Sequence, residues 1–145
     1  MSEKLLNIQV VSNNRDNNLF KFFLNSLGYI KSLNKIASIT INYNGGITND
    51  AVVKSNNIIQ NLGFELHWTY NNYKFEKGKH KILKIRYDCD KVDGVHTPYI
   101  LLLDDDVEFL PGYDRQVLIA LNFLQSNPKA GIVSFFDCAP YTIKK

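Results

Sequence analysis

Short apolar segments that end in polar turns alternate along this chain with segments whose apolar residues recur at helical spacing. The first apolar segment, Leu5 to Val11, carries β-branched residues at its end and stops at three polar residues, which is typical of a buried strand. Apolar side chains then recur at positions 19, 20, 23, 24 and 27, which predicts a helix. Asp16 or Asn17 is placed to cap the start of this helix, and Gly28 is placed to end it.

Further strands are predicted where short apolar runs are bounded by turn residues: Ile36 to Ile41, Phe64 to Tyr70, Tyr99 to Leu103 and Ile132 to Phe136. Apolar and polar residues alternate between Phe64 and Tyr70, which indicates a half-buried strand at a sheet edge. The run from Tyr99 to Leu103 is uniformly apolar, which predicts a strand covered on both faces.

Further helices are predicted over positions 51–62, 82–92 and 117–124. Thr48 or Asn49 is placed to cap the first of these helices and Gly63 to end it, while Pro111 suits the first turn of the last. Five strands that alternate with four helices predict an α/β fold with a mainly parallel sheet flanked by helices. Because no repeat or linker tract divides the chain, we expect a single domain over residues 1–145.

Composition and charge exclude several classes of protein. The 145 residues are 45% apolar and 21% charged, as in an ordinary folded domain. Seventeen Lys and Arg against fourteen Asp and Glu give a net charge of +3, which is too small and too scattered to predict a nucleic-acid groove. No apolar run approaches the roughly 20 residues that span a bilayer, and no apolar signal core follows the N-terminus. We therefore expect a cytoplasmic protein with no transmembrane segment and no nucleic-acid partner.

The most distinctive feature is the acidic run Asp104-Asp105-Asp106, which directly follows the apolar run that ends at Leu103. Three adjacent carboxylates repel one another, so a nearby cation would stabilise them. In an extended chain Asp104 and Asp106 point to one side and Asp105 to the other, so the outer pair can share one hard cation. Mg²⁺ and Mn²⁺ are the ions that suit carboxylate, water and phosphate oxygens. The alternative is an acidic loop that is solvated or paired with Lys and Arg.

Asparagines gather directly after the predicted strands: Asn13, Asn14, Asn42, Asn44, Asn71 and Asn72. None of these amides would lie inside a sheet without hydrogen-bond partners. Ligands of open parallel sheets bind beyond the carboxyl ends of the strands, so we expect a shared polar rim there. If residues 12–15 and 104–106 serve one ligand, the strand from Tyr99 lies beside the strand from Leu5, and the strand from Ile36 lies on its other side.

At these positions the chain resembles the nucleotide-sugar-dependent glycosyltransferases of the GT-A fold, particularly those of family 2. Ser12-Asn13-Asn14-Arg15 matches the Thr/Ser-x-Asn-Arg run that commonly ends the first strand of the family. Asp104-Asp105-Asp106 matches the family's Asp-x-Asp after the fourth strand. Asn42 stands where the family usually has an Asp that reads the nucleobase, and Gly78 and Arg86 are the nearest matches to a glycine and an arginine that serve donor binding.

The resemblance implies a Rossmann-like GT-A fold and the transfer of a sugar from a nucleoside-diphosphate sugar to an acceptor hydroxyl. It implies that Asp104 and Asp106 hold Mn²⁺ or Mg²⁺ against the diphosphate. The donor contacts that it implies come from Ser12, Asn14, Arg15, Asn42, Asn72, Arg86, Asp104 and Asp105. It identifies no residue as the catalytic base, and it leaves the acceptor unknown.

The resemblance covers only the donor-binding half of the family's fold. Family members continue past their fifth strand into an acceptor-binding half, so we expect a fragment or compact form, or a second copy or partner chain that supplies the acceptor side. A non-catalytic nucleotide-sugar-binding or scaffold module is the alternative function. Haloacid-dehalogenase-like phosphatases also place Asp-x-Asp after an apolar strand, but Glu108 stands where they carry Thr or Val.

Overall fold

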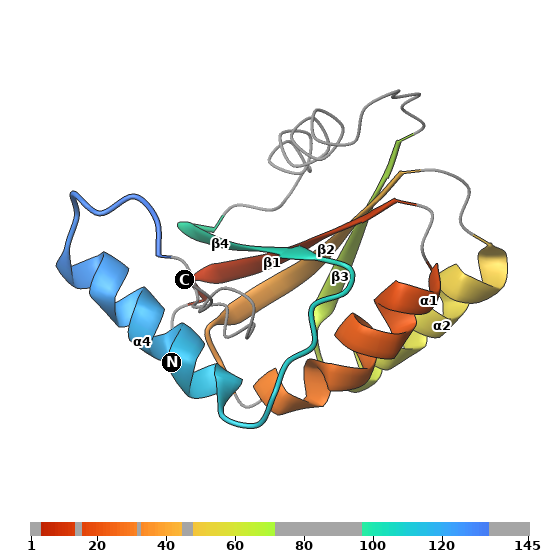
Figure 1. Ribbon diagram of the computed structural model, residues 1–145, viewed down its shortest axis with the longest axis horizontal. Coiled ribbons are helices and arrows are strands. Elements are labelled where there is room, and N and C mark those ends of the chain that lie inside the picture. Colours follow the sequence, from red (N-terminus) through yellow and green to blue (C-terminus); the bar gives the residue numbers. More distant parts are fainter. Residues whose placement is uncertain (1–3, 14–15, 32, 45–47, 72–96, 134–145) are drawn as a thin grey trace, which may run out of the picture. The chain divides into compact units, whose positions relative to one another are not determined.

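The computed structural model describes residues 4–13, 16–31, 33–44, 48–71 and 97–133, which form an α/β fold (Figure 1). The strands of this part of the chain are β1 (Leu6–Asn13), β2 (Ile36–Asn44), β3 (Glu65–Asn71) and β4 (Tyr99–Asp104). They form one sheet in the order β3-β2-β1-β4, and every neighbouring pair is parallel. The structure thus confirms the predicted parallel sheet, with β4 beside β1 and β2 on the other side of β1.

Helices connect the strands. The chain between β1 and β2 forms α1 (Asp16–Asn18), the π-helical η1 (Leu19–Leu24) and the 3₁₀-helical η2 (Leu27–Ile30). α2 (Asn49–Asn61) links β2 to β3, and α4 (Tyr113–Ser126) follows β4. The helix predicted over positions 82–92 lies outside the described residues.

The first helical segment continues past the residue that was predicted to end it. Gly28 lies inside η2, and it is not among the glycines with a positive φ, which in the described chain are Gly63 and Gly112. Leu27 and Ile30 are both buried, and residues three apart lie on the same side of a 3₁₀-helix. Burial of this pair favours one more helical turn, so the prediction for Gly28 was wrong.

Of the two residues predicted to cap the start of α2, Thr48 does so, and Gly63 follows its end as predicted. Thr48 has an extended backbone, with φ of −76° and ψ of 151°, and its side chain accepts a hydrogen bond of 3.2 Å from the backbone N–H of Ala51. This contact satisfies one of the N–H groups that a helix start leaves without an intrahelical partner. Gly63 follows the helix with φ of 83°, a conformation that glycine adopts without steric cost.

The connection from β4 into α4 differs from the prediction. Pro111 precedes the helix, which begins at Tyr113, because Gly112 has φ of 89° and cannot be helical. A hydrogen bond of 3.1 Å from the backbone N–H of Tyr113 to the carbonyl of Leu110 closes this turn. Of the fifth strand predicted at positions 132–136, only residues 132 and 133 are described, and neither is in a strand.

One face of the sheet is apolar and is covered by helices. Ile8 and Val10 of β1 and Ile39 and Ile41 of β2 are fully buried on this face. Trp68 of β3 shares it and donates a hydrogen bond of 3.0 Å from Nε1 to Oδ1 of Asn56 in α2. Figure 1 shows α1 and α2 together on this side of the sheet. The buried apolar side chains that these helical segments contribute are Leu19, Phe23, Leu24, Leu27, Ile30, Ala51 and Ile59.

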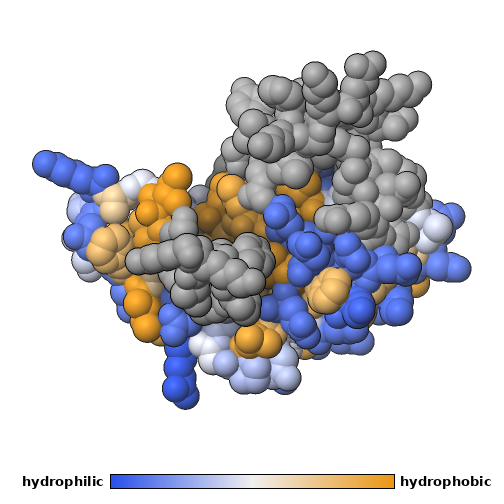
Figure 2. Space-filling view, viewed as in Figure 1, coloured by the Kyte–Doolittle hydropathy of each residue, from blue (hydrophilic) through white to orange (hydrophobic). Residues whose placement is uncertain are grey.

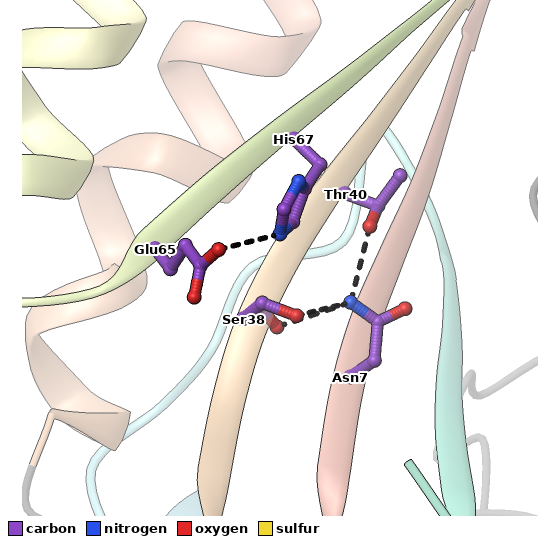
Figure 3. A network of polar contacts seen from close by, with 5 residues as sticks. All are labelled: Asn7, Ser38, Thr40, Glu65 and His67. Atoms are coloured by element: carbon purple, nitrogen blue, oxygen red, sulfur yellow. Dashed lines mark hydrogen bonds and ion pairs between the residues drawn. The ribbon is translucent and has the colours of Figure 1, made fainter. Parts of the chain in front are cut away.

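The other face of the sheet is polar. The register places Asn7 beside Ser38 and Gln9 beside Thr40, and all four side chains are buried. Nδ2 of Asn7 donates to Oγ of Ser38 at 2.9 Å and to Oγ1 of Thr40 at 3.1 Å (Figure 3). Hydroxyl groups of the neighbouring strand thus accept the hydrogen bonds of this buried Nδ2, whereas Oδ1 of Asn7 is buried without a hydrogen-bond partner among the described residues. β1 is buried as predicted, but its two faces differ in polarity.

On β3 this polar face carries a contact between a glutamate and a histidine side chain. Oε1 of Glu65 lies 3.1 Å from Nε2 of His67 (Figure 3). The alternation of polar and apolar residues on β3, and its place at an edge of the described sheet, agree with the sequence prediction.

As far as the described residues show, β4 is not covered on both faces, in contrast to the prediction. Leu101 and Leu103 pair with Ile8 and Val10 on the apolar face. Ile100 and Leu102 lie on the polar face and are 43% and 45% exposed. An uninterrupted apolar run therefore did not indicate burial of both faces.

Residue contacts divide the chain into two compact units, Met1–Asp114 and Arg115–Lys145. The first unit holds the sheet, and the second holds most of α4. On α4 the buried side chains are Val117 and Leu121, while Leu118, Ile119 and Phe123 contribute hydrophobic surface (Figure 2). The organisation as one domain stays a prediction. Within the described ranges, no helix has the length and apolar character that crossing a bilayer requires.

Candidate functional site

β1 and β4 end side by side at the same edge of the sheet. Val11 pairs with Asp104 of β4 and with Asn42 of β2. β1 and β2 extend further than predicted, because their parallel pairing continues through Ser12 and Tyr43. Ser12 and Asn42 therefore lie inside strands, where both are fully buried, rather than in the turns that follow.

The structure brings two of the predicted site residues into direct contact. Oγ of Ser12 donates a hydrogen bond of 2.9 Å to Oδ2 of Asp105, although 93 residues separate them in the sequence. Both side chains are 0% exposed. A buried carboxyl group that is left without a hydrogen-bond partner costs free energy. This contact therefore holds the turn after β4 against the end of β1.

The two carboxylates that flank Asp105 are exposed. Asp104 is the last residue of β4, and Asp106 lies in the turn that follows, which a hydrogen bond of 3.3 Å from the N–H of Val107 to the carbonyl of Asp104 closes. Asp104 and Asn42 both pair with Val11, so they share the polar face. Ser12 points to the apolar face, and Asp105 reaches it there. The predicted donor residues at this edge are thus divided between two faces of the sheet.

Asp104 and Asp106 are the predicted ligands of a divalent ion, and both are exposed. Among the residues that the structure describes, no three His, Cys, Asp or Glu side chains are grouped to hold a metal ion. Mg²⁺ is commonly bound through only one or two carboxylates, with water and substrate phosphate oxygens as its other ligands. Binding of such an ion by Asp104 and Asp106 stays a prediction.

The chain beyond the acidic run is held against the first helical segment. Oγ of Ser26 accepts a hydrogen bond of 2.8 Å from the backbone N–H of Phe109. The Phe109 ring is fully buried, and its centroid lies 5.9 Å from that of Phe23 and 5.0 Å from that of Tyr113. Burial in these surroundings raises the pKa of the Tyr113 hydroxyl above its ordinary value, because the phenolate would lose hydration.

Sequence reasoning did not identify Ser26 or Phe109. Ser26 lies on the buried side of the first helical segment, together with Phe23 and Leu27. A single hydroxyl among apolar side chains was the only feature of the sequence that could have pointed to it. Its partner lies 83 residues away in the sequence, so no local pattern connects the two.

The structure leaves four of the predicted donor residues undescribed. Asn14, Arg15, Asn72 and Arg86 lie outside the described residues. Their contacts with a donor, and those of Ser12, Asn42, Asp104 and Asp105, stay predictions.

No protein-family model matches this chain, and no curated protein matches it. Its function is therefore inferred from the geometry of the sheet edge and from the motifs in its sequence.

Ser12→Ala should lower the free energy of unfolding by about 1–3 kcal/mol, because the buried Asp105 carboxylate loses a hydrogen-bond donor. Urea unfolding of Ser12→Ala, Asp105→Ala and the double variant measures the coupling between the two side chains. We expect the double variant to lose less stability than the sum of the single variants, by roughly 0.5–3 kcal/mol. Additive losses would show that the contact contributes nothing to stability.

Proposed function

We propose that this chain is the donor-binding part of a metal-dependent glycosyltransferase with a GT-A-like fold. It would move a sugar from a nucleoside-diphosphate sugar to an acceptor hydroxyl. The observation that carries the proposal is the placement of the acidic run at the edge where the parallel strands β1 and β4 end. There Asp104 and Asp106 are exposed, while the buried Asp105 is bound to Ser12. Ligands of open parallel sheets bind at this edge.

In this proposal Asp104 and Asp106 hold Mn²⁺ or Mg²⁺ together with the donor diphosphate. The bound ion would offset the negative charge that grows on the diphosphate as the bond to the sugar breaks. Ser12 and Asp105 contribute rigidity, because their mutual hydrogen bond holds the turn that carries the two exposed carboxylates. Asn42 lies at the same level of the sheet as Asp104, since both pair with Val11, but its side chain is fully buried.

Thermal unfolding with a panel of nucleoside-diphosphate sugars, each with Mn²⁺ and with EDTA, tests the binding part of the proposal. A ligand at 100 times its Kd stabilises a protein by about 2.7 kcal/mol. For a chain of 145 residues this corresponds to roughly 5–10 °C in the unfolding temperature. We expect such a shift for at least one donor with Mn²⁺ and a much smaller one with EDTA. A panel with no shift under either condition would contradict the proposal.

A separate measurement tests the catalytic part. Incubation of the chain with the bound donor and Mn²⁺, without acceptor, should release free sugar slowly as water takes the place of the acceptor. Binding without any release of sugar would support the alternative of a non-catalytic nucleotide-sugar-binding module. The second copy or partner chain that supplies the acceptor side is part of the same proposal, and addition of such a chain should raise the rate.

A further inference from the structure

Two buried serines hold the acidic loop, which we define as residues 104–109. Ser12 holds its beginning through the side chain of Asp105, and Ser26 holds its end through the backbone N–H of Phe109. Between these contacts Asp106 and Glu108 are exposed. A loop that is fixed at both ends by buried hydrogen bonds has few backbone conformations available, so the backbone that carries its exposed carboxylates is held in place.

Ser26 makes a hydrogen bond to the loop in addition to the one that a buried helical serine ordinarily makes within its own helix. Its hydroxyl donates to the carbonyl of Phe22 at 2.7 Å, as serines in helices commonly do, and its oxygen then accepts from Phe109. Ser55 of α2 is a matched case, since it is also buried and donates to the carbonyl of Ala51 at 2.8 Å. The hydrogen bond from a distant segment distinguishes Ser26 from this ordinary arrangement.

We infer that Ser26 is a positioning residue for metal-dependent diphosphate binding at Asp104 and Asp106. This inference rests on the proposed function and extends it to a residue that lies outside the motifs of the glycosyltransferase resemblance. Ser26 acts through the backbone of Phe109: it fixes the end of the acidic loop and so fixes Asp106 relative to Asp104. Residues that orient the ligands of a metal commonly change its affinity by about 10–100-fold when they are replaced.

Ser26→Ala removes the acceptor for the Phe109 N–H, and Ser55→Ala is the matched control. Ser26→Thr keeps the hydroxyl and should restore the contact, because a helical Thr can also donate to the carbonyl four residues earlier. Ser26→Cys, with a weakly accepting sulfur, is a second test variant of nearly native volume. All variants are compared at a temperature at which far-UV circular dichroism shows them to be fully folded.

Calorimetric titration with Mn²⁺ and uridine, guanosine or thymidine diphosphate, whichever the wild-type chain binds, gives the decisive readout. We expect Ser26→Ala to raise the Kd by about tenfold or more, with Ser26→Cys close to it. Ser26→Thr and Ser55→Ala should keep the wild-type Kd. A merely structural role of Ser26 would lower the unfolding temperature but leave the Kd of the folded protein unchanged.

Hydrogen exchange of the Phe109 amide tests the contact without any ligand. It should be slow in the wild-type chain and in Ser55→Ala, and it should become at least tenfold faster in Ser26→Ala. An unchanged rate in Ser26→Ala would overturn the inference. So would an unchanged Kd in Ser26→Ala beside normal wild-type binding, and in that case the proposed function would stand. If the wild-type chain binds none of the diphosphates with Mn²⁺, both the inference and the proposed function are wrong.

Discussion

Asp106→Asn should abolish most of the Mn²⁺-dependent binding of a nucleoside diphosphate while the fold persists. The side chain is exposed in the turn after β4, so the replacement has no buried contacts to disrupt. It keeps the size of the side chain but removes one of two charged oxygen ligands. With Mn²⁺ present we expect the Kd to rise on the order of 100-fold, or about 2.8 kcal/mol. Calorimetric titration of both proteins, with Mn²⁺ and with EDTA, measures this effect.

Glu65→Gln is a suitable control for the loss of one carboxylate. Glu65 begins β3 and pairs in register with Ser38, so it lies toward the opposite end of the sheet from Asp104. Its replacement should leave the Kd unchanged. In EDTA, Asp106→Asn should be at least as stable as the wild-type chain, because one repulsion between neighbouring carboxylates is removed. Equal Mn²⁺-dependent affinity of Asp106→Asn and wild type would mean that the acidic run is a solvated loop.

Phe109→Ala should cause the largest loss of stability among the replacements near this edge. The ring is fully buried between those of Phe23 and Tyr113, at centroid distances of 5.9 Å and 5.0 Å. Removal of a buried phenylalanine ring costs about 3–5 kcal/mol, from lost transfer free energy and from the cavity that remains. Since domains are stable by only about 5–15 kcal/mol, this variant should be partly unfolded or close to unfolding at 37 °C.

Urea unfolding followed by circular dichroism measures this loss, and Phe123→Ala provides the control. Phe123 of α4 is 50% exposed, so the same chemical change there should cost much less. Phe109→Leu should give an intermediate loss and remain folded well enough for accurate measurement. Equal losses from Phe109→Ala and Phe123→Ala would show that the Phe109 ring contributes no more to the core than a surface side chain.

Local sequence patterns were sufficient to predict which described segments are helices and which are strands, and their order along the chain. The cap at Thr48 and the left-handed Gly63 after α2 depend on residues only a few positions away, so the sequence predicts them directly. The strand order followed from polar residues at positions 12–15 and 104–106, because one shared site requires their strands to be neighbours. Gly28 and Pro111 were misjudged because burial of Ile30 and the positive φ of Gly112 outweighed the usual signals.

The sequence by itself determined the parallel α/β architecture and the presence of an acidic run at a strand end, because both depend on the period of apolar residues and on adjacent positions. The tertiary structure decided which of these residues touch. Ser26 and Ser55 look alike in the sequence, since each is a lone serine on a buried helical stripe. Only the path of the chain after β4 brings the Phe109 N–H to Ser26 and leaves Ser55 bonded to its own helix. Such pairings depend on which distant segments the packed core brings together, and no local pattern encodes that.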